Sequence, residues 1–224
     1  MSPEISLKRA AKLKQKKHRE TERLFLAEGR SLVEEVPFSP VHTFTELEEV
    51  KRLSTLTTPT GPVGVFAFLD VEAGKLLRSR ERLVLLHGVQ DPGNVGTVIR
   101  AAHAFGAGVA LSRGCADLYN PKTVRATMGS IFHAPVAREI ESVEFLERVR
   151  EAGFVSAAAV PEGGEPPRPA LSGKSLVVVG AEGSGLPEEV ESACEKKISI
   201  PAQAYSLNAA MAASILLYEA YGVC

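Results

Sequence analysis

The chain has 224 residues, 45% of them hydrophobic and 24% charged, with a formal net charge of −1 at pH 7. This composition is that of an ordinary soluble protein of one or two domains, large enough to bury a sizeable core. No apolar run reaches the ~20 residues that span a membrane, and the first residues lack the apolar segment of a signal peptide. We therefore expect a cytoplasmic protein with no membrane partner.

The three cysteines argue against two further classes of protein. Cys115, Cys194 and Cys224 are odd in number and show no C-x-x-C spacing. A disulfide framework needs pairs, and a structural zinc site needs clustered ligands. We expect unpaired thiols and no metal.

The N-terminal segment is strongly basic although the whole chain is nearly neutral. Residues 1–23 hold eight Lys or Arg against three Glu, which gives +5, and the remainder is −6. Basic segments bind polyanions because each neutralised phosphate releases counterions. We expect Lys12, Lys16, Lys17 and Arg19 to contact RNA or DNA, although a solvated helix face would have the same composition.

The next part of the chain contains few predicted elements. An amphipathic helix is predicted over residues 20–36, with Leu24, Leu26, Leu32 and Val33 on its apolar side. A second helix is predicted over residues 45–53, and a strand over residues 63–68. So few elements bury little apolar area alone. Residues 1–76 are therefore expected to form a small α+β domain that leans on the rest of the chain or on a partner.

From residue 83 onward, apolar strands alternate with helices. Strands are predicted over residues 83–89, 109–111, 132–136, 155–160, 175–179 and 198–200, and helices over residues 95–105, 121–128, 143–151, 187–195 and 207–221. This alternation predicts an α/β domain over residues 77–224, with a mostly parallel sheet covered by helices on both faces.

Three strand-to-helix loops of that domain point to one ligand site. They are Asp91-Pro-Gly-Asn94, Gly180-Ala-Glu-Gly-Ser-Gly-Leu186, and the polar loop from Pro201 to Ser206-Leu207-Asn208. Helix starts present unpaired N–H groups, and ligands of such sheets bind beyond the carboxyl ends of the strands. The glycine turn is not a Rossmann cofactor loop, because only about forty residues follow it where such a fold needs more of the sheet.

These motifs resemble those of a known family. Asp91-Pro-Gly-Asn-Val-Gly-Thr-Val-Ile-Arg100, the glycine turn, and Ile200-Pro201 with Ser206-Leu207-Asn208 occur in the order of the three motifs of the SpoU (TrmH-like) family within the SPOUT class. The resemblance covers about residues 83–222. Residues 120–136 are similar to the family's segment between its first two motifs. The N-terminal part resembles the family's small ribosomal-protein-like substrate-binding domain in an abbreviated form.

The resemblance implies an enzyme that uses S-adenosylmethionine to methylate a ribose 2′-hydroxyl of structured RNA, either rRNA or tRNA. It further implies a homodimer with a C-terminal trefoil knot, and the apolar terminal helix with Leu216, Leu217, Tyr218 and Tyr221 is consistent with dimerisation. The cofactor pocket carries over onto Gly180, Gly183, Gly185, Ile200 and Leu207. Catalytic roles carry over onto Asn94, Arg100, Glu182, Ser206 and Asn208.

The chemistry limits what Arg100 can do. A ribose hydroxyl is a poor nucleophile and must lose its proton as it attacks the methyl group. A guanidinium holds its protons too tightly to act as a base, so stabilising the developing alkoxide is the less costly role. A phosphate clamp and a surface ion pair are the alternatives.

The other candidates each have a structural alternative. Asn94, Ser206 and Asn208 could hold the nucleotide or cap helices, and Glu182 could shape its loop or handle a proton. Lys122 and Arg125 are expected to touch RNA phosphates, or else to form a solvated helix face.

Two alternative functions remain open. One is an RNA-binding or ribosome-assembly protein with weak or no catalysis, and the other is a small-molecule enzyme. Residues 202–205 form a shorter loop than the family's and lack its customary glycine, which shifts the expected pocket wall. Retention of all five catalytic candidates favours the enzyme.

Overall fold

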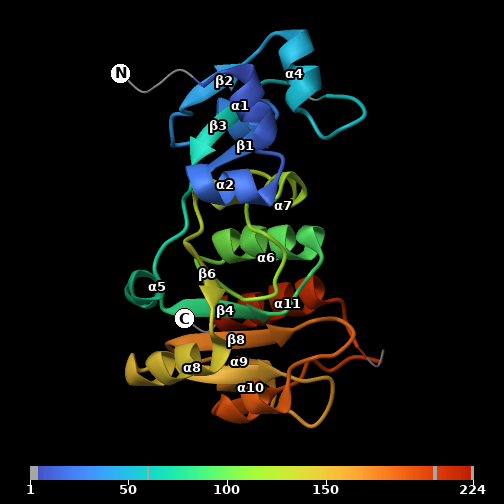
Figure 1. Ribbon diagram of the computed structural model, residues 1–224. Coiled ribbons are helices and arrows are strands. Elements are labelled where there is room, and N and C mark those ends of the chain that lie inside the picture. The colour runs from blue at the N-terminus through green and yellow to red at the C-terminus, as the bar shows by residue number, and fades with distance from the viewer. Residues whose placement is uncertain (1–4, 60, 204–205, 223–224) are drawn as a thin grey trace.

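The computed structural model describes residues 5–59, 61–203 and 206–222, which form two units stacked along one long axis (Figure 1). The smaller, N-terminal unit contains an antiparallel sheet in the order β1-β3-β2. Its strands are β1 (Leu24–Glu28), β2 (His42–Phe44) and β3 (Val63–Ala67), and its helices are α1 (Leu7–Lys12), α2 (Lys16–Glu22), α3 (Arg30–Val33) and α4 (Leu47–Leu53). The helix predicted over residues 45–53 and the strand predicted over residues 63–68 are confirmed within two residues.

The helix predicted over residues 20–36 is wrong. Helix α2 ends at Glu22 because Arg23 adopts left-handed backbone angles, with φ of 54°, and Gly29 turns the chain again at φ of 108°. Strand β1 lies between these turns. It is buried on both sides, since Phe25 joins the large core shared with the other unit whereas Leu26 joins the small unit's own core. A strand covered on both faces is a continuous apolar run, which periodicity alone does not separate from a helix.

The larger unit contains a six-stranded sheet in the order β6-β5-β4-β8-β7-β9, and every neighbouring pair in it is parallel. Its strands are β4 (Arg82–His87), β5 (Gly108–Ser112), β6 (Val136–Ile140), β7 (Val155–Ala159), β8 (Ser175–Gly180) and β9 (Lys196–Ile198). Its helices are α5 (Ala73–Ser79), α6 (Pro92–Ala104), α7 (Pro121–Ala126), α8 (Ser142–Glu151), α9 (Pro167–Ala170), α10 (Glu188–Ala193) and α11 (Ala209–Tyr221), with a 3-10 helix at Ser130–Phe132. The predicted α/β architecture with a parallel sheet is confirmed.

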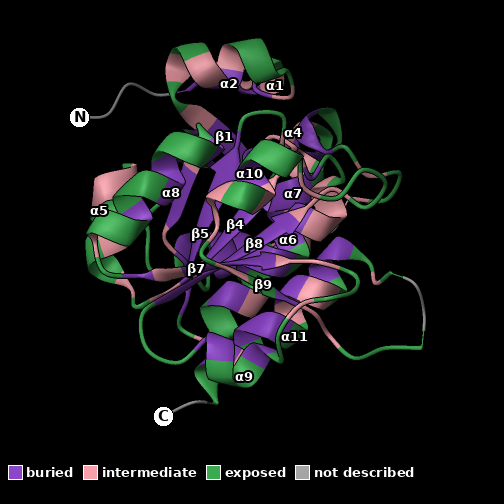
Figure 2. Ribbon diagram, turned by 90° about the horizontal axis from the view of Figure 1, so that it is seen from below, coloured by how far each residue is buried: buried purple, intermediate pink, exposed green. Residues whose placement is uncertain are grey.

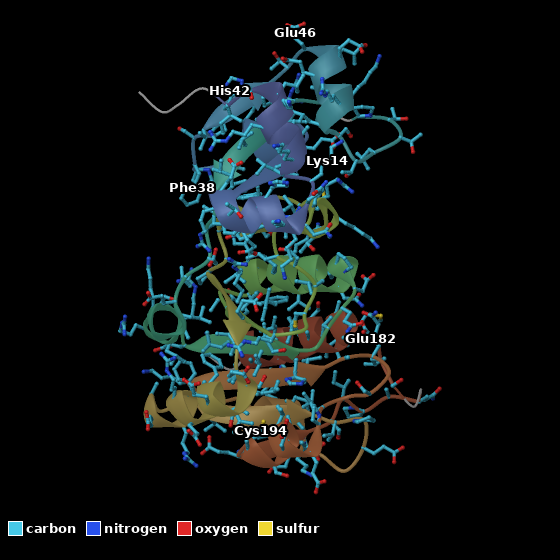
Figure 3. All side chains as sticks on the ribbon, in the orientation of Figure 1. Lys14, Phe38, His42, Glu46, Glu182 and Cys194 are labelled. Carbon is cyan, nitrogen blue, oxygen red and sulfur yellow. The ribbon has the colours of Figure 1, made fainter. Side chains whose placement is uncertain are left out.

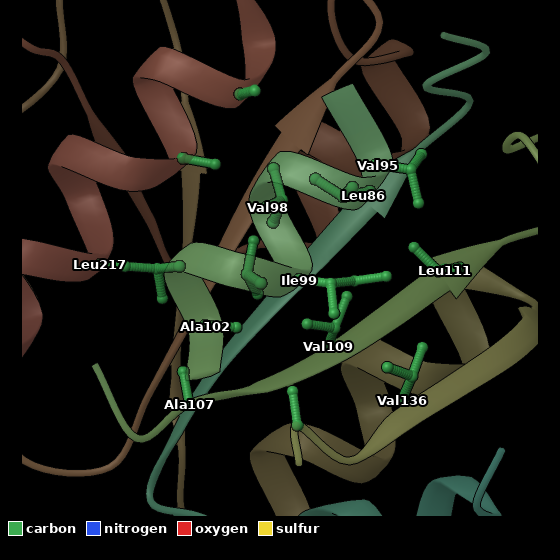
Figure 4. Packing of buried hydrophobic residues seen from close by; sticks show 14 of the residues in the cluster. Leu86, Val95, Val98, Ile99, Ala102, Ala107, Val109, Leu111, Val136 and Leu217 are labelled. Carbon is green, nitrogen blue, oxygen red and sulfur yellow. The ribbon is translucent and has the colours of Figure 1, made fainter. Parts of the chain in front are cut away.

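Alternate residues of the central strand β4 supply two apolar layers. Val84 and Leu86 pack in one cluster with residues of α6 and α11, as the close view in Figure 4 shows for Leu86. Leu83 and Leu85 pack in a second cluster with residues of α5, α8 and α10. Viewed from below, the buried strands lie between α5 and α8 on one side and α9 and α11 on the other (Figure 2). Helices therefore cover both faces of the sheet, as predicted.

Two predicted strands are displaced along the chain. The strand predicted over residues 132–136 begins only at Val136, because the preceding residues form the 3-10 helix after Gly129, which has φ of 90°. Ile131 and Phe132 are buried in that tight turn, so their hydrophobicity does not indicate a strand. Strand β9 ends at Ile198, and Ile200 lies in the loop that follows.

The two units share an apolar core. Ring centroids of Phe25 and Tyr119 lie 4.8 Å apart, as do those of Phe66 and Phe132. This contact confirms that the N-terminal part leans on the larger unit. Helix α5 packs on the larger sheet through Leu76, and residues 68–72, which precede it, join the two units.

Three absences hold for the described residues. No helix among them combines the length and hydropathy that crossing a membrane requires. Their His, Cys, Asp and Glu side chains form no group of three that could hold a metal ion. Cys115 and Cys194 are free thiols, while Cys224 lies outside the described residues.

Candidate active site

A cavity of about 350 Å³ lies at the carboxyl ends of β7, β8 and β9 and beside the start of α11. Ligand pockets in proteins commonly have volumes of about 300–1,000 Å³. Seven of the residues expected at the site line this cavity: Gly180, Glu182, Gly183, Gly185, Ile200, Ser206 and Leu207. The structure therefore brings together the second and third motifs as the sequence predicts.

The glycine turn after β8 closes tightly on itself. The N–H of Gly185 donates to the carbonyl oxygen of Ala181 over 2.9 Å, and Gly185 has φ of 65°. A Cβ added at Gly180 would collide with the backbone of Gly185 and Leu186, whereas one added at Gly183 would meet open space. The turn requires glycine at 180 and 185, and Gly183 leaves the cavity wall without a side chain.

Asn94 connects the three motifs. Its side-chain amide donates to the carboxylate of Glu182, and its own amide oxygen accepts from Nδ2 of Asn208 over 3.2 Å. Both asparagines stand at helix starts, because the N–H of Asn94 donates to the Asp91 cap of α6 and Asn208 itself caps α11. Figure 3 shows Glu182 at the edge of the larger unit. The capping alternative is therefore true of Asn208, whose side-chain oxygen caps α11 while its amide nitrogen donates to Asn94.

Electrostatics support the start of α6. The backbone N–H of Asn94 and the Lys122 ammonium, 3.6 Å from the carboxylate, hold the pKa of Asp91 below its usual value. Asp91 therefore stays ionised, and a charged cap stabilises the helix start more than a neutral one. Lys122 thus supports the loop that carries Asn94 in addition to any contact with RNA.

Arg100 lies on the exposed face of α6, six residues after Asn94. Its side chain has no hydrogen-bond or ion-pair partner among the described residues and does not line the cavity. Its guanidinium is therefore available to a ligand that approaches from solvent. The surface ion pair considered as an alternative is not formed with any residue that the structure describes.

Sequence reasoning missed one wall of the cavity. Ala159, Val160 and Pro161 line it where β7 ends, and Glu191 lines it from α10. The sequence after β7, Val160-Pro-Glu-Gly-Gly164, has the same Pro and Gly signal as the three recognised loops. In the shortened loop, Ala202 lines the cavity, and residues 204–205 lie outside the described residues.

The candidate RNA contacts are divided by their environments. Lys12 and Lys17 are exposed, and Lys16 lies 4.0 Å from the carboxylate of Glu139. Arg125 donates to the hydroxyl of Thr55 over 2.7 Å, which joins α7 to the N-terminal unit. The predicted contact of Arg19 with RNA is wrong, because this residue is only 2% exposed and its guanidinium pairs with Asp117. A buried, paired arginine has no donors to offer a phosphate from solvent.

The apolar face expected for dimerisation on the terminal helix is also different from the prediction. Leu216 and Leu217 pack inside the unit's own core and are not available to a partner. The large apolar side chains that α11 does expose are Met211, Ile215, Tyr218 and Tyr221. Their spacing places them along one side of the helix.

Comparisons with known proteins agree with this site. Residues 81–218 match the SpoU rRNA Methylase family, and residues 5–43 match the MRM3-like substrate binding domain. The chain is 32% identical over 234 aligned positions to the 23S rRNA (guanosine(2553)-2′-O)-methyltransferase RlmP of Bacillus subtilis (strain 168), which covers 94% of each protein.

Solved structures show the same similarity. The AdoMet-bound rRNA methyltransferase from Sinorhizobium meliloti superposes with a TM-score of 0.87 at 31% identity, covering 96% of this chain and 93% of that one. The SpoU methyltransferase AviRb from Streptomyces viridochromogenes, in complex with AdoMet, gives a TM-score of 0.80 at 27% identity, covering 96% and 97%. This chain belongs to the SpoU rRNA methylase family. It is an S-adenosylmethionine-dependent RNA methyltransferase, and the resemblance seen in its motifs is confirmed.

Proposed function

We propose that this enzyme transfers a methyl group to a ribose 2′-hydroxyl of ribosomal RNA, with tRNA as the other RNA class to test. One observation carries the proposal: the cavity walled by the second and third motifs is joined through Asn94 to α6, the helix that bears Arg100. The named activity of the Bacillus subtilis relative on 23S rRNA supports ribosomal RNA as the first candidate.

The cavity suits S-adenosylmethionine. Its walls combine apolar side chains such as Val179 and Leu216 with the exposed backbone of the glycine turn, and a ligand with an adenine ring, a ribose and an amino acid needs both kinds of wall. When bound, the cofactor supplies an electrophilic methyl group on its sulfonium. We assign the cofactor contacts to Gly180, Gly183, Gly185, Ile200 and Leu207, with Ala159 and Val160 added from the structure.

Arg100 is proposed to stabilise the alkoxide that forms as the 2′-hydroxyl loses its proton. A cation beside developing negative charge lowers the barrier, and the guanidinium of Arg100 is exposed and unpaired among the described residues, so that a ribose approaching from solvent can reach it. Asn94 donates to Glu182, which lines the cavity together with Ser206, and Asn208 donates to Asn94. These four residues are proposed to orient the target ribose.

The remaining family expectations stay proposals. A homodimer is supported by the exposed stripe of Met211, Ile215, Tyr218 and Tyr221 on α11, because exposed apolar stripes often mark interfaces. A trefoil knot is proposed from the family, and the loop after β7 packs closely alongside the end of β9, since a Cβ at Gly164 would strike the backbone of Ile198 and Ser199. We place the enzyme in the cytoplasm. Light scattering of Ile215→Glu tests the dimer, which this change should dissociate.

A methyl-transfer assay tests the proposed function. Purified protein is incubated with rRNA or tRNA transcripts and methyl-labelled S-adenosylmethionine, and the product is mapped for 2′-O-methyl groups. We expect label at a single ribose of one rRNA. Labelling of bases alone, or binding of RNA without any methyl transfer in the presence of bound cofactor, would contradict the proposal.

A further inference from the structure

The linker between the two units is held by a single buried tyrosine. The hydroxyl of Tyr119 accepts the backbone N–H groups of Leu69, over 2.6 Å, and Asp70, over 2.7 Å, and it donates to Oδ1 of Asp70 over 2.8 Å. The ring of Phe68 stacks on that of Tyr119, with centroids 3.8 Å apart and planes 16° from parallel. Three consecutive linker residues are therefore bound to one side chain of the larger unit.

Arg138 joins this linker to the N-terminal unit. From β6, its guanidinium donates to both carboxylate oxygens of Glu20 on α2, over 2.6 and 3.0 Å, and lies 3.2 Å from the carboxylate of Asp70. The same guanidinium lies over the rings of Phe68 and Tyr119, at 4.9 and 5.5 Å from their centroids. Its side chain is 12% exposed. Solvent screens such a bidentate pair much less than an exposed one.

A second pair, with both side chains largely buried, crosses the same boundary. Arg19 of α2 pairs with Asp117, whose other carboxylate oxygen accepts the N–H of Tyr119 over 3.0 Å and whose carbonyl accepts the Thr123 hydroxyl of α7. Helix α7 in turn packs so closely on α6 that a Cβ at Gly96 would collide with Ala126. The N-terminal unit is thus tied, through side chains and helix contacts, to the helix that carries Asn94 and Arg100.

We propose that Arg138 is a positioning residue that locks the N-terminal unit in one orientation, so that the distance between bound RNA and methyl donor selects the ribose to be methylated. The inference rests on the proposed function, because it concerns where that reaction occurs. Neighbouring riboses lie one nucleotide apart along an RNA strand. A shift of the N-terminal unit by that distance presents a neighbouring ribose to the cofactor.

Three variants separate this lock from a general contribution to stability. Arg138→Lys keeps the charge but loses the two-pronged contact with Glu20, and Glu20→Gln removes only the partner on α2, which keeps the test open if Arg138→Lys folds poorly. Glu139→Gln is the control, because Glu139 follows Arg138 on the same strand and its pair with Lys16 is long and more than half exposed on both sides.

Hydrogen exchange of the Leu69 and Asp70 amides measures the lock without RNA or cofactor. We expect both amides to exchange at least ~10-fold faster in Arg138→Lys and Glu20→Gln, and at the parent rate in Glu139→Gln, because local opening frees N–H groups from their acceptor. Unchanged exchange in both test variants would overturn the lock.

Methylation mapping measures the consequence. We expect both test variants to raise the KM for RNA at least several-fold and to place methyl groups on riboses next to the target, with cofactor affinity within twofold of the parent. A single methylated ribose in a variant whose linker amides exchange faster would overturn the selection role. Inactivity of the parent enzyme would instead contradict the proposed function, and the exchange data would still decide whether the lock exists.

Discussion

The cofactor cavity and the junction between the two units are built in opposite ways. The cavity is formed by backbone turns and small residues of the second and third motifs and of the end of β7, and its conformation depends on glycines such as Gly180 and Gly185. The junction depends on long charged side chains that are far apart in sequence, since Arg19 and Asp117 are separated by 98 residues and Glu20 and Arg138 by 118. A site made of local turns can be recognised in a sequence, whereas a site made of distant pairs needs the fold.

Arg100→Ala should have the largest effect on the cavity side of this comparison. We expect kcat to fall by about 10²–10³-fold, as on removal of one preorganised charge-stabilising group, with cofactor affinity within a few-fold because Arg100 does not line the cavity. Single-turnover methyl transfer and calorimetry measure the two quantities. Arg113→Ala is the matched control, since Arg113 is an exposed arginine paired with Glu141. Parent-like turnover in Arg100→Ala would reject the assigned role.

Gly180→Ala tests whether backbone geometry builds the cavity. The added Cβ collides with Gly185 and Leu186, so we expect cofactor affinity to fall by roughly 100-fold and the free energy of unfolding to fall by about 1–3 kcal/mol, a usual cost of overpacking. Calorimetry and urea unfolding measure these changes. Gly183→Ala meets open space and should change unfolding little. Equal effects of the two substitutions would show that the turn is not held as tightly as described.

Much of the larger unit could be predicted from the sequence because its rules are local. Apolar strands alternating with helices indicated the parallel sheet, and the glycine turn and the Asn94 and Asn208 loops indicated the end of the sheet at which the cavity lies. The helix predicted over residues 20–36 failed because burial of β1 on both faces is a tertiary effect. Arg19 was taken for a phosphate contact because composition does not reveal that Asp117 lies beside it.

Asn94→Ala removes the residue that links the three motifs. We expect a loss of about 10–100-fold in kcat/KM, because the change frees Glu182 and Asn208 from a shared partner and misplaced groups slow reactions by such factors. Steady-state kinetics measure kcat/KM on the unmodified transcript that the methyl-transfer assay identifies as the substrate. Asp91→Asn is the control, since it weakens the helix cap and leaves the Asn94 side chain in place. A larger loss in Asp91→Asn than in Asn94→Ala would assign the effect to the helix start.

Arg125→Ala should weaken RNA binding moderately. We expect about 3–10-fold lower affinity and a salt dependence reduced by about one counterion, as for a single phosphate contact. Filter binding at several salt concentrations measures both quantities. Arg168→Ala provides a control on the far side of the larger unit, where Arg168 pairs with Glu219. An unchanged salt dependence in Arg125→Ala would contradict a phosphate contact and would leave Arg125 only the structural role of its bond to Thr55.

The junction should lose stability in acid through Asp70. Burial alone raises the pKa of Asp70, but the Tyr119 hydroxyl and the Arg138 and Arg23 guanidinium groups outweigh it and lower that pKa below 3.8. A carboxyl whose folded pKa is depressed contributes stability above its unfolded pKa, and this stability is lost as pH falls through the folded value. Urea unfolding between pH 6 and pH 3 should therefore show a smaller acid loss in Asp70→Asn than in the parent. An identical pH dependence of the two proteins would contradict the claim that ionised Asp70 stabilises the junction.

The last helix gives this enzyme a built-in order of assembly. Asn208 completes the link to Asn94 and Glu182, and α11 and the residues just before it supply one wall of the cavity. A chain that stops before α11 keeps all six strands of the larger sheet and the glycine turn but lacks this wall and the link from Asn208 to Asn94. We therefore expect such a chain not to hold the cofactor.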